Sequence, residues 1–101
     1  MELYSSRTLD ELGRIVVHSD LRKSLKLETG DKFSFTLVGT IIILQKLDGE
    51  PEPNGAVSEI SDIGLITIPS EMRKQLGWNA KDEIAVYFTD NLLILKSAKV
   101  S

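Results

Sequence analysis

Hydrophobic and polar residues alternate along two segments of the chain. Residues 32–45 read KFSFTLVGTIIILQ, and residues 83–96 read EIAVYFTDNLLILK. Alternation with a period of two is typical of β-strands with one buried face. Turn residues at Val38-Gly39 and Asp90-Asn91 divide each segment, so each predicts a β-hairpin. The run 41–44 (IIIL) is apolar at every position, which predicts that both faces of this strand are covered.

A short strand and a short helix are expected before each hairpin. The runs 14–18 (RIVVH) and 65–69 (LITIP) follow a glycine and are rich in β-branched residues, as strands leaving a tight turn are. Ser19 and Ser70 then stand where N-caps are expected. Apolar residues four positions apart give each helix one apolar face, namely Leu21 with Leu25 and Met72 with Leu76.

The chain repeats itself at a shift of 51 positions. Without a gap, this shift aligns residues 13–44 with residues 64–95, and most positions keep their polar or apolar character. Gly77 is a typical helix stop in the second copy, whereas Lys26 takes its place in the first. The identical pairs are Gly13/Gly64, Ile15/Ile66, Ser19/Ser70, Arg22/Arg73, Lys23/Lys74, Leu25/Leu76, Asp31/Asp82, Ile43/Ile94 and Leu44/Leu95.

We therefore interpret the chain as two tandem strand-helix-hairpin repeats. Residues 1–46 form the first repeat, residues 47–57 a linker with proline, glycine and acidic residues, and residues 58–101 the second repeat. A unit of about 40 residues rarely buries a sufficient core alone. We expect the two repeats to share one core in a mainly β fold with short helices.

Composition narrows the possible functions. The 101 residues include no cysteine, which excludes disulfides and thiolate metal sites. No stretch approaches the roughly 20 apolar residues of a membrane span, and the N-terminus lacks a signal-peptide pattern, so we expect a cytoplasmic protein without a membrane partner. The formal net charge is −3, yet residues 7–46 carry seven basic and five acidic side chains, a net charge of +2. Local charge therefore matters more than the total.

Catalytic chemistry finds little support in the sequence. His18 is the only histidine, and a metal or catalytic role would need partners that the chain lacks. Asp10, Glu11 and Asp62 lie in turns before strands, where solvation, or pairing with Arg14, is the expected role. No glycine-rich phosphate loop and no metal-ligand spacing is present. We expect neither an enzyme nor a cofactor.

The segment RTLDELGRIVVHSDLRKSLKLETGDKFSFTL, residues 7–37, resembles the AbrB/SpoVT DNA-binding domain of bacterial transition-state regulators, within the superfamily of MazE and MraZ. The signature is DELGR, then a strand, then LRKSL. The resemblance covers most of both repeats and is closer in the first. It implies a swapped-hairpin β-barrel in which two units exchange hairpins. With two units in one chain, it implies an intrachain pseudo-dimer.

The resemblance also implies DNA contacts by basic residues around the turn, the strand start and the helix. On this chain they fall on Arg7, Arg14, Arg22 and Lys23 in the first repeat, and on Arg73 and Lys74 in the second. The second repeat has Ser58 and Leu65 opposite Arg7 and Arg14, and the first has His18 in place of Pro69. The alternative is that the helix cations only solvate an outer helix face.

The main hypothesis is a transcriptional regulator, associated with the nucleoid, that grips phosphates of double-stranded DNA through the first repeat. Readout by DNA shape and assembly into a homo-oligomer are expected. One alternative is a protein-interaction module such as a MazE-type antitoxin. Those relatives carry a long C-terminal tail, whereas only KSAKVS follows the last predicted strand, so we do not expect a toxin partner. The other alternative is an assembly barrel that does not bind DNA.

Overall fold

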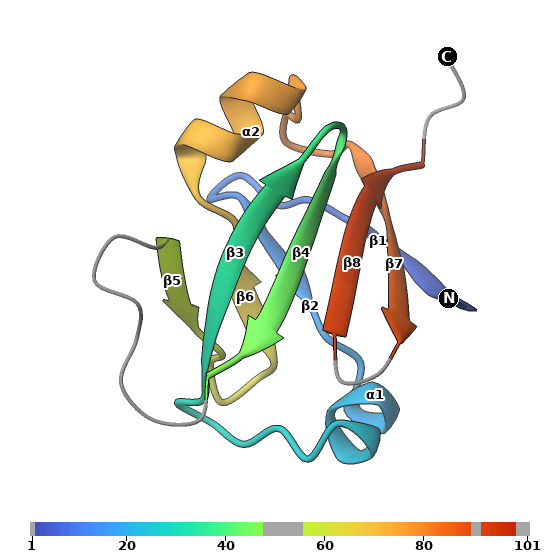
Figure 1. Ribbon diagram of the computed structural model, residues 1–101, viewed down its shortest axis with the longest axis vertical. Helices are drawn as coiled ribbons and strands as arrows, with labels where there is room; N and C mark the ends of the chain where they lie inside the picture. Colours follow the sequence, from blue (N-terminus) through green and yellow to red (C-terminus); the bar gives the residue numbers. More distant parts are fainter. Residues whose placement is uncertain (1, 48–55, 90–91, 99–101) are drawn as a thin grey trace.

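A computed structural model describes residues 2–47, 56–89 and 92–98 (Figure 1). The same order of elements occurs twice in it, strand, strand, helix and hairpin. The elements are β1 (Glu2–Thr8), β2 (Arg14–Val16), α1 (Ser19–Ser24), β3 (Lys32–Val38), β4 (Ile41–Lys46), β5 (Ala56–Glu59), β6 (Leu65–Thr67), α2 (Ser70–Leu76), β7 (Glu83–Thr89) and β8 (Leu92–Ser97). Among the described helices, none combines the length and apolar character that crossing a membrane requires.

The strands form a curled six-stranded sheet and a two-stranded ribbon. The order in the sheet is β1-β7-β8-β4-β3-β5, and the ribbon pairs β2 with β6, always antiparallel. The first strand of each half pairs with the hairpin of the other half, β1 with β7 and β5 with β3. This exchange confirms the mainly β, swapped-hairpin architecture, and it closes within one chain.

An approximate two-fold axis relates the halves. Ile15 pairs with Ile66 at the centre of the ribbon, and Ile43 pairs with Ile94 across β4 and β8. Both pairs join residues 51 positions apart in the sequence. The rotation axis that exchanges the two halves therefore passes through both pairs. The repeated order of elements agrees with the expected tandem organisation, and the division into two family copies at residues 46 and 58 stays a prediction.

The core lies between the ribbon and the concave side of the sheet. Both halves contribute to it, and Trp78 of the second half belongs to it. The buried cluster comprises Leu9, Ile15, Val17, Leu21, Phe33, Phe35, Ile42, Leu44, Ile60, Ile66, Ile68, Trp78, Ile84, Val86, Leu93 and Leu95. One core shared by two short halves explains how units of this size bury enough apolar surface.

The prediction that both faces of the IIIL strand are covered is wrong for one of the two faces. Ile42 and Leu44 are fully buried on the inner face, whereas Ile41 and Ile43 are half-buried on the outer face. Figure 1 shows this outer face toward the viewer, with no described helix or strand packed over it.

Two strands and several boundaries differ from the prediction. The strands β1 and β5 were not predicted, because the polar sequence ELYSSRT of β1 does not alternate and β5 has only four residues. Because β5 begins at Ala56, the last two residues of the predicted linker belong to a strand. The first hairpin turns at Gly39-Thr40, one residue later than expected, and the expected turn at Asp90-Asn91 lies outside the described residues.

The N-caps also lie one residue earlier than predicted. His18 precedes α1, and its Nδ1 accepts a hydrogen bond from the backbone N–H of Asp20 at 3.3 Å. Pro69 precedes α2 and forms no side-chain capping bond. Ser19 and Ser70 are instead the first residues of the helices.

Candidate nucleic-acid interface

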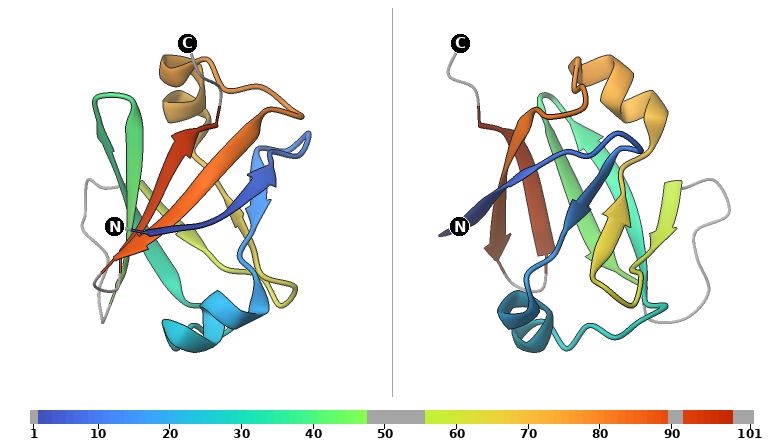
Figure 2. Two further views of the ribbon diagram at one scale, coloured as in Figure 1. Left: turned by 90° about the vertical axis from the view of Figure 1, so that its right-hand side faces the viewer. Right: turned by 180° about the vertical axis from the view of Figure 1, so that it is seen from behind.

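The β2–β6 ribbon lies between the two helices on the side of the molecule opposite the β4–β8 pair (Figure 2, right). Ile15 and Ile66 point into the core, so Arg14, Val16, Leu65 and Thr67, which alternate with them, face outward. The strands are antiparallel, and each is followed two residues later by a helix. Helices α1 and α2 therefore stand at opposite ends of the ribbon.

At each end an arginine of one half covers a glycine of the other half. The guanidinium of Arg73 lies over Gly13, and that of Arg22 lies over Gly64. Both glycines have a positive φ, +78° and +83°, in the tight turns 10–13 and 61–64. A side chain at either position would collide with its neighbours, which explains glycine at both positions.

The two arginines also fix the backbone in front of their own helices. Nε of Arg73 donates to the carbonyl oxygen of Ile68 at 3.0 Å, and Nε of Arg22 donates to that of Val17 at 3.1 Å. The N–H groups of Ile68 and Val17 in turn donate to the carbonyl oxygens of Gly13 and Gly64 at 2.8 and 2.7 Å. Arg22 and Arg73 are therefore structural as well as cationic.

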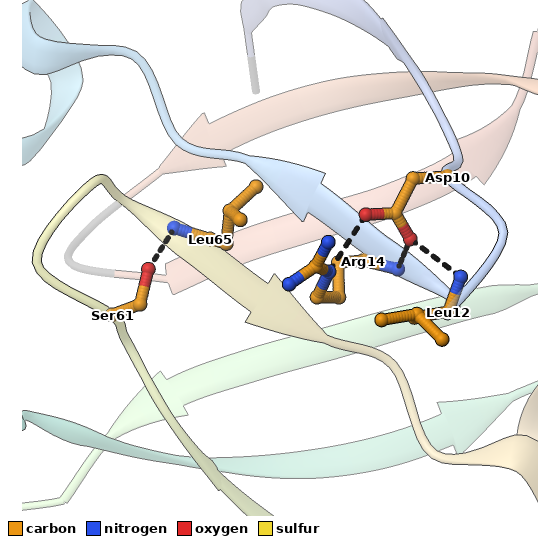
Figure 3. Close-up of polar contacts among 5 residues, drawn as sticks. All are labelled: Asp10, Leu12, Arg14, Ser61 and Leu65. Atoms are coloured by element: carbon orange, nitrogen blue, oxygen red, sulfur yellow. Dashed lines mark hydrogen bonds and ion pairs between the residues drawn. The ribbon is translucent and has the colours of Figure 1, made fainter.

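Asp10 organises the first turn and pairs with Arg14 (Figure 3). Its Oδ1 accepts hydrogen bonds from the N–H groups of Arg14 and Leu12 at 2.8 and 2.9 Å, and its Oδ2 accepts one from Nε of Arg14 at 2.7 Å. The hydrogen bond from the Arg14 N–H, aided by the guanidinium, holds the pKa of Asp10 below its ordinary value. The predicted pairing of Asp10 with Arg14 is confirmed.

The second turn keeps the hydrogen bond but lacks the ion pair. Oγ of Ser61 accepts from the N–H of Leu65 at 3.0 Å, in the place where Asp10 accepts from Arg14 (Figure 3). Because Leu65 carries no charge, the ribbon presents an arginine at one end and an apolar side chain at the other.

The predicted DNA-contacting residues of the ribbon and helices fall into two clusters. The α2-end cluster comprises Arg14, Arg73 and Lys74, because Arg14 pairs with Thr67 just before α2 and follows the glycine beneath Arg73. The α1-end cluster comprises Arg22 and Lys23. Lys23 and Lys74 are exposed, and the ion pairs among the described residues involve neither. The first-repeat cations thus do not form one clamp, since Arg14 groups with the second repeat.

Arg7 belongs to neither cluster. It lies on β1, where its register partner is the fully buried Ile84, so its side chain starts on the core side of the sheet. Arg7 is half-buried, and its Nε is buried without a hydrogen-bond partner among the described residues.

One cation of this region was missed by the sequence analysis. Lys26 is exposed directly after α1, with a left-handed φ of 56°, and it lines an open depression together with Arg22 and Lys23. The available signal was the repeat itself, because the same alignment puts Gly77 at this position in the second half.

Comparisons with known proteins agree with this architecture. Residues 64–101 match the family model described as antidote-toxin recognition MazE, bacterial antitoxin. The chain is 38% identical over 45 residues to the transition state regulatory protein AbrB of Bacillus subtilis, a match that covers 45% of this chain and 47% of that protein. The chain thus spans about half the length of this curated relative.

The solution structure of PHS018 from Pyrococcus horikoshii has a similar fold. Its TM-score is 0.57 at 22% identity, and the match covers 100% of this chain and 99% of that one. This similarity extends over both halves, whereas the sequence matches are local. Together with the exchanged hairpins, these findings agree with the resemblance seen in the sequence: the second half is similar to the MazE antitoxin family, part of the chain is similar to AbrB, and the whole chain shares its fold with the PHS018 structure.

Proposed function

We propose that the chain is a transcriptional regulator that binds double-stranded DNA through the outer face of the β2–β6 ribbon, with cations at both ends contacting backbone phosphates. The regulator would act in the cytoplasm at the nucleoid, and assembly of two or more chains belongs to the same proposal because it multiplies the phosphate contacts. No base-specific side-chain code is part of it, so selectivity would come from DNA shape.

The observation that carries the proposal is the presence of cations at both ends of one exposed ribbon. Gly13 stands opposite Ile68, and Gly64 stands opposite Val17, so the arginines over these glycines are separated by four residues along the ribbon. With a rise of about 3.3 Å per residue and about 4.8 Å between strands, the separation is roughly 14 Å. This is close to the ~12 Å width of the major groove, so the two clusters can reach the two backbones that border it.

Two further observations support the proposal. The relative AbrB is by its name a transition state regulatory protein. The exposed Lys23 and Lys74 follow the two fixed arginines on equivalent helical turns, so each end offers at least one hydrogen-bonded arginine and one exposed lysine. Arginine suits directed phosphate contacts through its planar fork, and lysine acts as a point charge.

The test is binding of a labelled 30-base-pair duplex by fluorescence anisotropy at two salt concentrations. The variant Lys23→Ala/Lys74→Ala removes two exposed cations, neither of which forms an ion pair with another described residue. Its matched control, Lys32→Ala/Lys96→Ala, removes two exposed cations from the six-stranded sheet. We expect the first variant to weaken binding about tenfold or more and to lower the salt slope by about 1.8, with little change in the control. Equal effects of both variants would contradict the proposed face.

The match of residues 64–101 to the MazE antitoxin model supports a second candidate, recognition of a partner protein. The same experiment separates the candidates. A chain that binds no duplex at 50 mM salt, while remaining folded by circular dichroism, would favour the protein partner over DNA.

A further inference from the structure

The most unusual backbone position near the ribbon belongs to Lys26. Its φ of 56° is left-handed, a conformation that ordinary side chains rarely adopt and that glycine adopts readily. The equivalent residue of the second half is Gly77, with a φ of 69°. The chain thus holds a lysine in the first half at a place where the second half has the residue best suited to the conformation.

Hydrogen bonds at the end of α1 fix this conformation. The N–H of Lys26 donates to the carbonyl oxygen of Lys23 at 3.2 Å, and the N–H of Leu27 donates to that of Arg22 at 2.8 Å. Gly77 and Trp78 form the same pair of bonds at the end of α2. In addition, Nζ of Lys46 donates to the carbonyl oxygen of Lys26 at 3.2 Å and lies 3.4 Å from Oδ2 of Asp31. The backbone that carries the Lys26 side chain is therefore held from two sides.

The side chain of Lys26 completes a basic depression. The depression has a volume of about 630 Å³ and is lined by Ser19, Arg22, Lys23, Lys26, Leu27 and Glu28. Three cations and one carboxylate surround it. Lys23 and Lys26 form no ion pair within the described part of the chain, and Nε of Arg22 is fixed on Val17. Unpaired cations around a concave surface favour an anion of the size of a phosphate group.

The position of Lys26 after α1 does not by itself indicate a ligand, because a cation near a helix C-terminus is favourable without one. One observation points to a role beyond this. The depression brings Lys26 together with Arg22 and Lys23, which form the α1-end cluster of the ribbon face. The second left-handed lysine, Lys81 with a φ of 74°, provides an internal comparison, since it lies in the turn before β7 and its equivalent in the first half is Gly30.

We propose that Lys26 is an additional DNA contact, which with Arg22 and Lys23 holds one backbone phosphate in the depression at the end of α1. The contact exists in the first half alone, so it makes the two ends of the ribbon unequal in their hold on DNA. The proposal rests on DNA binding by the ribbon face and adds a residue and a subsite to it.

The two left-handed lysines give a matched experiment. Lys26→Gly and Lys81→Gly each remove one positive charge and relieve one left-handed side chain, so both should raise Tm by about 4–8 °C. Lys26→Asn removes the charge but keeps a side chain that tolerates this conformation. Each variant is measured with the labelled duplex at 50 and 200 mM salt.

We expect Lys26→Gly and Lys26→Asn to weaken binding about fivefold at 50 mM salt and to lower the salt slope by about 0.9, whereas Lys81→Gly binds as the unmodified chain does. Equal binding by all three variants and the unmodified chain would overturn the contact while leaving DNA binding by the ribbon in place. A loss confined to Lys26→Gly would also overturn it, because the backbone and not the charge would be responsible. No binding by the unmodified chain would remove the proposed function and this contact together.

Discussion

The guanidinium of Arg73 lies so close over Gly13 that a Cβ atom at this position would collide with its Cζ atom. The two residues belong to different halves of the chain, and Arg22 repeats the relationship with Gly64. Each helix is thereby fixed to the turn of the opposite half. The structure uses the same arginines to hold its halves together and to place positive charge at the ends of the ribbon.

Replacing either of the two glycines by alanine should destabilise the fold. Both positions have a positive φ, which costs a side chain about 1–2 kcal/mol. At Gly13 the new Cβ would collide with the guanidinium of Arg73, and at Gly64 it would meet the guanidinium of Arg22 and the carbonyl oxygen of Val17, the latter at 2.9 Å. We expect Gly13→Ala and Gly64→Ala each to lower the free energy of unfolding by about 2 kcal/mol or more in urea. A variant as stable as the unmodified chain would contradict the described packing.

The charge of Arg22 and Arg73, the two arginines that cover the glycines, can be separated from their hydrogen bonds. Arg73→Lys keeps the cation but loses the Nε donor to Ile68 and the planar group over Gly13. We expect a loss of about 1 kcal/mol in the free energy of unfolding, with DNA binding at low salt reduced less than by Arg73→Ala. Lys74→Arg, a change on the neighbouring exposed side chain, serves as the control. An unchanged urea midpoint for Arg73→Lys would show that the contacts of Arg73 with Ile68 and Gly13 do not contribute to stability.

A shared core predicts that damage in one half unfolds the other. Ile15 is 2% exposed and pairs with Ile66 of the other half, so Ile15→Ala should cost about 2–4 kcal/mol. Trp78, the only tryptophan, reports on the second half by fluorescence, and circular dichroism reports on the whole chain. The unfolding midpoints from tryptophan fluorescence and from circular dichroism should shift together. A tryptophan transition that stays in place while the circular dichroism shifts would mean that the halves fold independently.

Asp10 should contribute to the acid sensitivity of the protein. Its hydrogen bonds and the Arg14 guanidinium lower its pKa in the folded state. Its contribution to stability is therefore present above the ordinary aspartate pKa and is lost as the pH falls through the lower, folded value. We expect Asp10→Asn to be less stable at pH 7 and to lose less stability than the unmodified chain on going to about pH 3. Urea midpoints across this range test it, and parallel curves for both proteins would refute the assignment.

Local pattern predicted much of the fold. The alternation in residues 32–45 and the glycines before the short strands encode structure in their own neighbourhood. They led to the first hairpin, although its turn lies one residue later than predicted, and to the tight turns before β2 and β6. The strand β1 could not be read this way, because its polar residues pair with β7 from the other half. Register between distant segments is set by packing, and it carries no signal in a single strand.

The candidate site was predicted in part for the same reason. The pair of Asp10 and Arg14 is four residues apart and follows from sequence, as does the equivalence of Arg22 with Arg73. The position of Arg14 beside the second half depends on the antiparallel ribbon, which the sequence analysis did not include. Lys26 was overlooked because a lysine after a helix is ordinary in composition, although its alignment with Gly77 is a sequence signal for the left-handed backbone that distinguishes it.

The most direct test of the account is the salt dependence of duplex binding by the unmodified chain. Cations at both ends of the ribbon that together contact four to six phosphates predict that log K falls with log salt with a slope of about −3.6 to −5.4. Anisotropy titrations of one duplex between 50 and 300 mM salt give this slope. A value in that range supports DNA binding through the two clusters, whereas a slope near zero, or no binding at 50 mM salt, would contradict it.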